Sequence, residues 1–366
     1  MNTERDTILG DTIESGRRAA ASRYAVIYFG LGVAALAIFI WQSTRSSTDS
    51  KSPLLTAGGK IAPRPGPGRW VPVQGVKLGD IASLTFTPDG IFGALISSDG
   101  AVMQSSDGGA SWQAQPRPPI DSDAEVITAL SIMPPGLLVV GTHIDESDFT
   151  GLYTQASQRN WKAENGANGG ITCSTPNGWI LAGGSGLLGV RQGEGWHFIK
   201  VPGCENSTFR AVASWETTIL VAGEDGLVAR STDDGATWVL KRVPPPVGAH
   251  YPQHLHAVAI NRETAFAGGL DGTLWRSDSR GDRWARVTGL SQETMVAALY
   301  APSETEIIAA GGDPTGTKPF VCYSADAGLT WGFEPVHTAT ARITSIARGQ
   351  AGLFAATADG FLLKRQ

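Results

Sequence analysis

The octapeptide "SSDGGASW" at residues 105–112 returns as "STDDGATW" at 231–238 and as "SADAGLTW" at 324–331. A degenerate fourth copy, "SDSRGDRW", occupies 277–284. Ser and Asp side chains can satisfy the backbone amides of a tight turn, and Gly adopts backbone angles that other residues resist. The pattern therefore predicts one turn that recurs because a larger structural unit recurs.

The three intact copies assign the same roles to their Ser, Asp, Gly and Trp residues. We expect Ser and Asp to hold the turn, Gly to permit its shape and Trp to cover it. The aspartates are therefore interpreted as turn residues and not as catalytic carboxylates. The residues concerned are Ser105, Asp107, Gly109, Trp112, Ser231, Asp233, Gly235, Trp238, Ser324, Asp326, Gly328 and Trp331.

The chain around these turns repeats a pattern of four short apolar strands separated by Gly-containing turns. Such units indicate an all-β fold, a seven-bladed β-propeller. The units span 81–115, 126–164, 171–200, 209–241, 255–287, 296–334 and 343–365.

The last unit ends before its fourth strand, the strand that carries Trp in the other units. The segment "GRWVPVQ" at 68–74 has the missing pattern, with Trp70 in the corresponding place. We therefore expect this N-terminal strand to complete the last blade and close the ring, which removes two unpaired sheet edges.

The octapeptide resembles the Asp-box of bacterial neuraminidase repeats, which occurs in sialidases, sortilins, xyloglucanases and the photosystem II stability/assembly factor family. The compact blades of 69–366 look most like the last family. This resemblance implies a non-enzymatic propeller without a cofactor that holds membrane-protein partners during assembly. It also suggests an accessory subunit of an inner-membrane protein complex, with a resistance–nodulation–division transporter as one candidate.

The same resemblance leaves an alternative open, an envelope glycan-binding protein or a glycoside hydrolase of sialidase-like fold. Such an enzyme would need an Arg triad, a Tyr–Glu nucleophile pair, an Asp acid and an Arg-Ile-Pro signature. The sequence has no Arg-Ile-Pro, and Tyr153 and Tyr323 fall in strands next to turn motifs. We therefore predict no catalytic residues.

A membrane anchor is predicted before the propeller. Residues 24–41, "YAVIYFGLGVAALAIFIW", carry no charge and nearly reach the ~20 residues of a transmembrane helix. Arg17, Arg18 and Arg23 precede the segment and favour a cytoplasmic N-terminus. The expected location is thus the bacterial inner membrane, with a single pass and the propeller in the periplasm.

These patterns divide the chain into four parts. They are a cytoplasmic tail at 1–23, a transmembrane helix at 24–42, a flexible linker at 43–68 and the propeller at 69–366. The linker is rich in Ser, Thr, Pro and Gly, a composition that cannot bury enough apolar surface to fold alone.

The sequence argues against a nucleic-acid-binding site and against a metal site. A net charge of −5 gives no basic footprint for nucleic acid. His250, His254 and His256 lie close together in sequence, but no nearby Cys or carboxylate completes a metal site. We expect them to belong to a polar connection between blades and expect no bound metal.

Candidate recognition residues come from the innermost strand of each unit, which starts with the frame apolar, variable, small, apolar. Arg210 and His256 occupy the variable position, and Arg342 lies just before such a frame. We expect these three to form a recognition face at the channel, although solvated strand ends would show the same pattern. The variable positions recognised by this frame are Ala82, Thr128, Arg210, His256, Ala297 and Thr344.

Overall fold

The computed structural model describes residues 59–366, except 121–124, 134–135, 145–150, 158–159, 165–169, 177, 194, 250–252 and 338. The predicted tail, transmembrane helix and first part of the linker lie outside the described residues. Within the described part of the chain, no helix is long and apolar enough to cross a bilayer.

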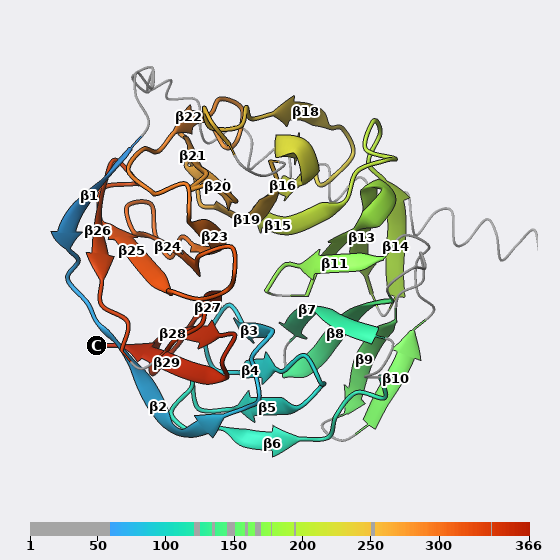
Figure 1. The fold of residues 1–366 in the computed structure, drawn as a ribbon. Helices are drawn as coiled ribbons and strands as arrows, with labels where there is room; N and C mark the ends of the chain where they lie inside the picture. Colours follow the sequence, from blue (N-terminus) through green and yellow to red (C-terminus); the bar gives the residue numbers. More distant parts are fainter. Residues whose placement is uncertain are drawn as a thin grey trace, which may run out of the picture. The chain divides into compact units, whose positions relative to one another are not determined.

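The described residues form seven β-sheets arranged as the blades of a propeller (Figure 1). We number the blades in the order of their innermost strands. Blades 1 to 3 each pair their strands in sequence order. Their elements are β3 (Ser83–Phe86), β4 (Gly93–Ile96), β5 (Val102–Ser105), β6 (Gln113–Gln115), β7 (Glu125–Met133), β8 (Leu137–Ile144), β9 (Leu152–Ser157), β10 (Asn160–Glu164), β11 (Ile171–Ser174), β12 (Ile180–Gly183), the 3-10 turn η1 (Gly184–Gly186), β13 (Leu187–Gln192) and β14 (Gly195–Lys200).

Blades 4 to 7 follow the same plan, with additions from the N-terminal side in the last two. Their elements are β15 (Phe209–Trp215), β16 (Thr218–Gly223), η2 (Glu224–Gly226), β17 (Leu227–Ser231), β18 (Val239–Arg242), β19 (Leu255–Ile260), β20 (Ala265–Gly269), β21 (Leu274–Ser277), β22 (Ala285–Arg286), β23 (Met295–Tyr300), β24 (Ile307–Gly312), β25 (Phe320–Ser324), β26 (Thr330–Glu334), β27 (Ile343–Gly349), β28 (Gly352–Thr357) and β29 (Phe361–Arg365), with β1 (Lys60–Pro65) and β2 (Trp70–Lys77).

The ring closes through β2, which pairs antiparallel with β29 and places Trp70 opposite Arg365. Blade 7 therefore takes its outermost strand from the N-terminal side, as the sequence pattern predicted. Trp70 is fully buried, and its indole Nε1 donates a hydrogen bond of 2.9 Å to Glu334 of blade 6.

The linker prediction is wrong for Lys60–Pro65. This segment forms β1, a fifth strand that pairs in parallel with β26 of blade 6. Proline lacks an N–H donor and is tolerated only at the edge of a sheet, which is where β1 lies. The prolines that suggested a flexible linker are thus compatible with an outer strand.

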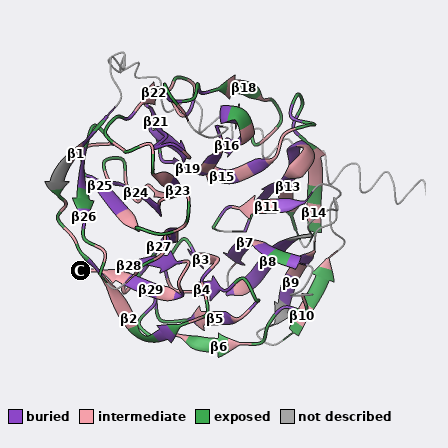
Figure 2. Ribbon diagram, in the orientation of Figure 1, coloured by how far each residue is buried: buried purple, intermediate pink, exposed green. Residues whose placement is uncertain are grey.

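The core lies between the blades and not inside each one. Among the described residues, each of the seven clusters of buried apolar side chains draws on two neighbouring blades. The second strands β12, β16 and β24 are buried along their whole length. The outer strands β6 and β18 are mostly exposed (Figure 2). A single blade cannot bury both of its faces, so the ring is the stable unit.

The repeated octapeptide is the turn between the third and fourth strands. In blade 4, Ser231 Oγ donates to Asp233 Oδ1 at 2.8 Å and accepts from the amide of Gly235 at 2.8 Å. The Asp233 carboxylate also accepts from the amide of Thr237 at 2.8 Å and from its hydroxyl at 2.6 Å. Blades 1 and 6 repeat this geometry with Ser105, Asp107, Gly109, Ser324, Asp326 and Gly328.

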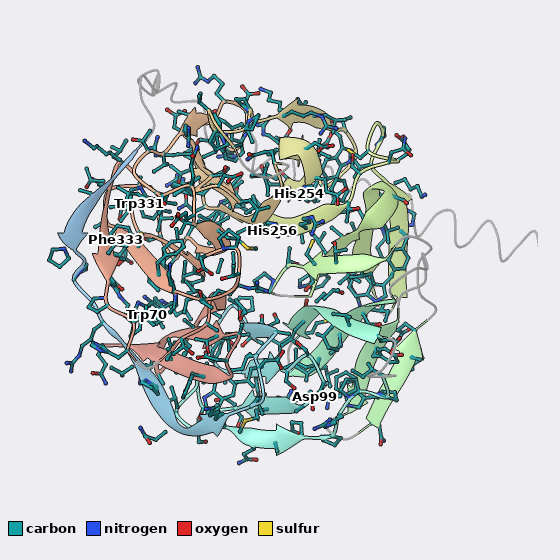
Figure 3. All side chains as sticks on the ribbon, in the orientation of Figure 1. Trp70, Asp99, His254, His256, Trp331 and Phe333 are labelled. Atoms are coloured by element: carbon teal, nitrogen blue, oxygen red, sulfur yellow. The ribbon has the colours of Figure 1, made fainter. Side chains whose placement is uncertain are left out.

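The Trp of the turn packs against the preceding blade. Trp331 of blade 6, which is labelled in Figure 3, contacts Phe266 of β20 edge to face, with ring centroids 6.1 Å apart. Trp112 of blade 1 meets Phe354 of β28 in the same way at 6.3 Å. The motif therefore connects blades as well as shaping the turn.

Candidate functional site

The innermost strands line two cavities on the propeller axis that share four residues. The start-side cavity, where the innermost strands begin, has a volume of about 780 Å³. The end-side cavity, where they run into hairpins, has a volume of about 700 Å³. Both cavities are lined by Arg210, His256, Ala297 and Thr344.

A β-bulge places the variable residue of the frame on the start-side cavity. In six innermost strands, the pairing with the second strand shifts at this residue. A bulge redirects a side chain that regular pairing would place elsewhere. The bulged residues are Thr128, Thr172, Arg210, His256, Ala297 and Thr344, and all of them line the cavity together with Ala82.

Thr172 is the one residue of this ring that sequence reasoning missed. Its segment reads "ITCS", with Ser174 where the frame requires an apolar residue. Ser174 can replace an apolar residue because its hydroxyl donates a hydrogen bond of 3.3 Å to the carbonyl of Leu130 in blade 2.

The three bulged threonines link neighbouring blades. Thr344 Oγ1 of blade 7 donates to the carbonyl of Ile81 at the start of blade 1, at 2.9 Å. Thr128 and Thr172 donate in the same way to the first frame residue of blades 3 and 4. A threonine at this position therefore has a structural role.

Arg210, His256 and Arg342 depart from this pattern and gather on the start-side cavity. Arg210 Nη2 lies 2.9 Å from Glu224 Oε1, whereas the guanidinium of Arg342 has no ion-pair partner among the described residues. Figure 3 shows His256 at the inner side of the ring. Burial, followed by the charges of Arg210, His254 and Arg342, lowers the pKa of His256 to about 4, so its imidazole is neutral at pH 7.

The described part of the histidine segment contains His254 and His256. The rings of His254 and His256 are 6.4 Å apart and nearly perpendicular, and His250 lies outside the described residues. No group of three His, Cys, Asp or Glu residues with metal-binding geometry occurs among the described residues.

Among the described residues, two tyrosines hydrogen-bond to a glutamate, but neither pair lines the start-side or the end-side cavity. Tyr153 Oη lies 3.0 Å from Glu125, and Tyr323 Oη lies 2.7 Å from Glu306. Both tyrosines are on third strands, away from the axis. Burial and the hydrogen bond to Glu306 raise the pKa of Tyr323, which disfavours the phenolate. These pairs therefore do not create a sialidase-like nucleophile at the channel.

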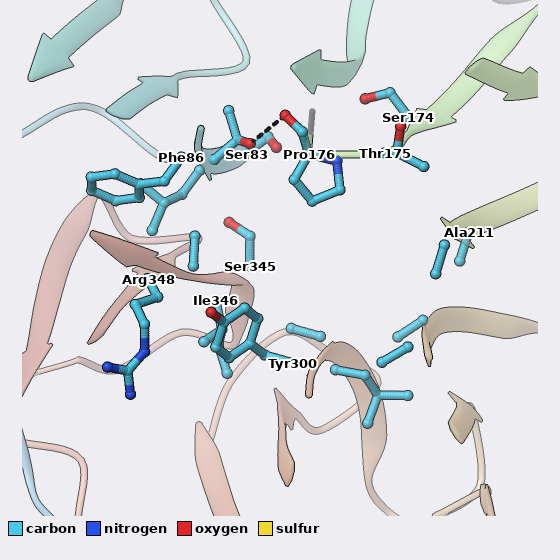
Figure 4. A pocket seen from close by; sticks show the side chains of 18 of the residues that line it. Ser83, Phe86, Ser174, Thr175, Pro176, Ala211, Tyr300, Ser345, Ile346 and Arg348 are labelled. Carbon is cyan, nitrogen blue, oxygen red and sulfur yellow. Dashed lines mark hydrogen bonds between the residues drawn. The ribbon is translucent and has the colours of Figure 1, made fainter. Parts of the chain in front are cut away.

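The end-side cavity combines aromatic side chains with hydroxyl groups. Trp215, at the end of β15, is 40% exposed and lines the cavity with Tyr300 and Arg348. Figure 4 shows Tyr300, Ser345 and Arg348 on one side of the opening and Pro176 on the other. The hydroxyl of Ser345 is buried and has no hydrogen-bond partner among the described residues. Such an opening can accommodate an extended ligand with both apolar and polar groups.

No protein-family model and no curated protein sequence matches the chain. Many solved structures match its fold, and two of them are YCF48 proteins. "YCF48 bound to D1 peptide" superposes with a TM-score of 0.58 at 15% identity, over 82% of this chain and 97% of that chain. "YCF48 from Cyanidioschyzon merolae" gives a TM-score of 0.60 at 15% identity, over 81% of this chain and 98% of that chain. At this identity the similarity concerns the fold.

Proposed function

We propose that this chain is a non-enzymatic, membrane-anchored accessory or assembly subunit whose propeller binds an extended segment of a membrane-protein partner. The observation that carries the proposal is the end-side cavity with its aromatic rim. Trp215 offers a large apolar surface, and exposed Trp residues at cavities often dominate the energy of protein recognition.

Polar groups that line the end-side cavity can form hydrogen bonds with the backbone of a peptide. Ser345 has an unused hydroxyl, and Ser83 and Ser214 also line the cavity. Arg348 adds a positive charge near Tyr300. The likeness to a propeller described as bound to D1 peptide supports a peptide as the ligand.

The proposed partner is a membrane protein of unspecified family. No contact or comparison points to the resistance–nodulation–division transporter suggested by the resemblance, so the proposal does not include it. The glycan-binding alternative would also use an exposed Trp beside hydroxyl groups. A peptide is favoured over a glycan by the similar propeller that holds one.

The proposal includes an inner-membrane location with the propeller in the periplasm. It rests on the uncharged segment 24–41 and on Arg17, Arg18 and Arg23. In spheroplasts, added protease should cut between residue 43 and the propeller and leave the N-terminal tail intact. A propeller that stays protected until the membrane is broken would contradict this topology.

Photo-crosslinking tests the binding surface in native membranes. Trp215 would be replaced by p-benzoylphenylalanine in the full chain. The matched control carries the same replacement at Val247, which is 94% exposed and lines neither cavity described above. A covalent adduct with a membrane protein from position 215 alone supports the proposal. Equal adducts from both positions, or none from position 215, would refute it, and an adduct with a glycan would favour the alternative.

A further inference from the structure

Along one part of the start-side cavity, which we call the arc, the residues at the bulge are not threonines. Blades 2, 3 and 7 carry Thr at the bulge, but blades 4, 5 and 6 carry Arg210, His256 and Ala297 in succession. Each of these three blades forgoes the hydrogen bond that Thr makes to the next blade. Arg342 of blade 7 completes the arc beside Ala297 and Thr344 on the same cavity.

The charge of this arc is positive. The described residues that line the cavity include two cations, Arg210 and Arg342, and one anion, Glu224. Glu224 is paired with Arg210 at 2.9 Å, so the charge of Arg342 remains uncompensated. The whole chain has a net charge of −5, and the local excess is therefore not a general property of the surface.

One N–H donor of the arc is also unused. Arg210 Nε is buried without a hydrogen-bond partner among the described residues. Buried polar atoms in native proteins are nearly always bonded, so such atoms suggest an unoccupied acceptor position. Ala297, between His256 and Arg342 in the order of the blades, has a side chain too small to fill the space.

We propose that Arg342, His256 and Arg210 bind a small oxyanion, a carboxylate or a phosphate-type group, in the start-side cavity next to Ala297. This site adjoins the peptide site proposed above, because Arg210, His256 and Ala297 line both cavities. The two sites still differ in their other residues: Arg342 lines only the start-side cavity, and Trp215, Tyr300 and Arg348 line only the end-side cavity. Charge-assisted hydrogen bonds from Arg to oxyanions are among the stronger polar interactions in proteins.

Anion binding is coupled to the protonation of His256. The charged or titratable groups that act on its imidazole are Arg210, His254 and Arg342, and Glu224 acts through Arg210. A bound anion offsets the two arginines and favours the imidazolium. Binding therefore raises the pKa of His256 from about 4, and by linkage the affinity increases as the pH falls.

The test uses sulfate, which remains a dianion between about pH 4 and 8, with chloride at matched ionic strength as the control. The full chain in detergent micelles, labelled with ¹³C-histidine, would be titrated by NMR, and H256Q would assign the resonance. We expect sulfate to raise the His256 pKa in a saturable way that chloride does not reproduce. No saturable change with sulfate would overturn the proposal.

Three variants assign the effect to the arc. Removing one charge-assisted contact in R342Q should weaken sulfate binding by about tenfold or more. A297L should block binding by filling the space, whereas R348Q in the end-side cavity should leave it unchanged. Equal losses in R342Q and R348Q would show a general charge effect and refute the site. Because R348Q alters the proposed peptide cavity alone, failure of the anion site can be distinguished from failure of the peptide site.

Discussion

The carboxylate of Asp233 accepts three hydrogen bonds within its own turn, two from Thr237 and one from Ser231. These bonds, led by the Thr237 hydroxyl, lower the pKa of Asp233 to about 2. The pKa in the unfolded chain is about 3.9, so the ionised form favours folding. This contribution is complete above about pH 4 and is lost as the pH falls towards about 2.

We predict that D233N lowers the melting temperature by a few degrees at pH 7 and by much less near pH 2.5. The Asn side chain keeps the shape of Asp but cannot carry the charge that the turn stabilises. Melting followed by circular dichroism at both pH values checks this. D234N is the matched control, because Asp234 accepts no hydrogen bond among the described residues. A temperature difference independent of pH would contradict the prediction.

Glu334 of blade 6 contacts the two strands that pair to complete blade 7. Its side chain is fully buried and accepts hydrogen bonds from Trp70 Nε1 at 2.9 Å, the Gly68 amide at 3.1 Å and Arg365 Nε at 3.0 Å. We predict that E334Q destabilises the protein by about 3 kcal/mol or more, because Arg365 is left as a nearly buried, unpaired cation.

Urea unfolding of E334Q and of E334Q/R365M tests this explanation. The double variant removes the cation, and the Gln carbonyl can still accept from Trp70. We expect the double variant to be more stable than E334Q alone. An equally unstable double variant would show that the hydrogen bonds of the carboxylate matter and the unpaired charge does not.

At the scale of the elements, the bulge of the innermost strand determines what lines the channel. The hydroxyl of Thr344 reaches blade 1 across the closure of the ring. T344V keeps the β-branched shape and removes this hydrogen bond, so we predict a loss of about 1 kcal/mol.

The reverse substitution is available in blade 6. A297T places a hydroxyl where it can reach the carbonyl of Ile343, as the threonines of other blades do. We expect a modest gain of at most about 1 kcal/mol, measured by urea unfolding. A stabilising T344V or a strongly destabilising A297T would disprove the claim that a threonine at the bulge stabilises the propeller by bonding to the next blade.

At the scale of the whole molecule, the N-terminal strands β1 and β2 contribute unequally to the folding of the propeller. Deleting residues 1–65 removes the edge strand β1 and leaves β2 in place. Deleting residues 1–77 also removes β2 with the fully buried Trp70, and with it the chain connection between blades 7 and 1. We predict that the first truncation folds with a lower melting temperature and that the second aggregates. Size-exclusion chromatography and near-ultraviolet circular dichroism compare the two, and equal behaviour would contradict the closure argument.

The sequence by itself determined the propeller, the number of its blades and the strand that closes it. These features depend on patterns that are local and repeated. A turn held by its own Ser and Asp side chains can be recognised wherever it occurs, and the missing fourth strand of the last unit points to Trp70. The frame of the innermost strands also predicted that Arg210, His256 and Arg342 lie near the channel, and all three line the start-side cavity.

The tertiary structure alone decided what these residues can do. The bulge that redirects Arg210 and His256 arises from pairing with the second strand, and the pairing of Arg210 with Glu224 occurs across the same blade. The strand β1 was unpredictable because prolines in an edge strand and in a linker give the same sequence pattern. The two cavities exist only because closure of the ring brings the starts of seven distant strands to one axis. Contacts of that range depend on blade stacking, and no local sequence pattern records them.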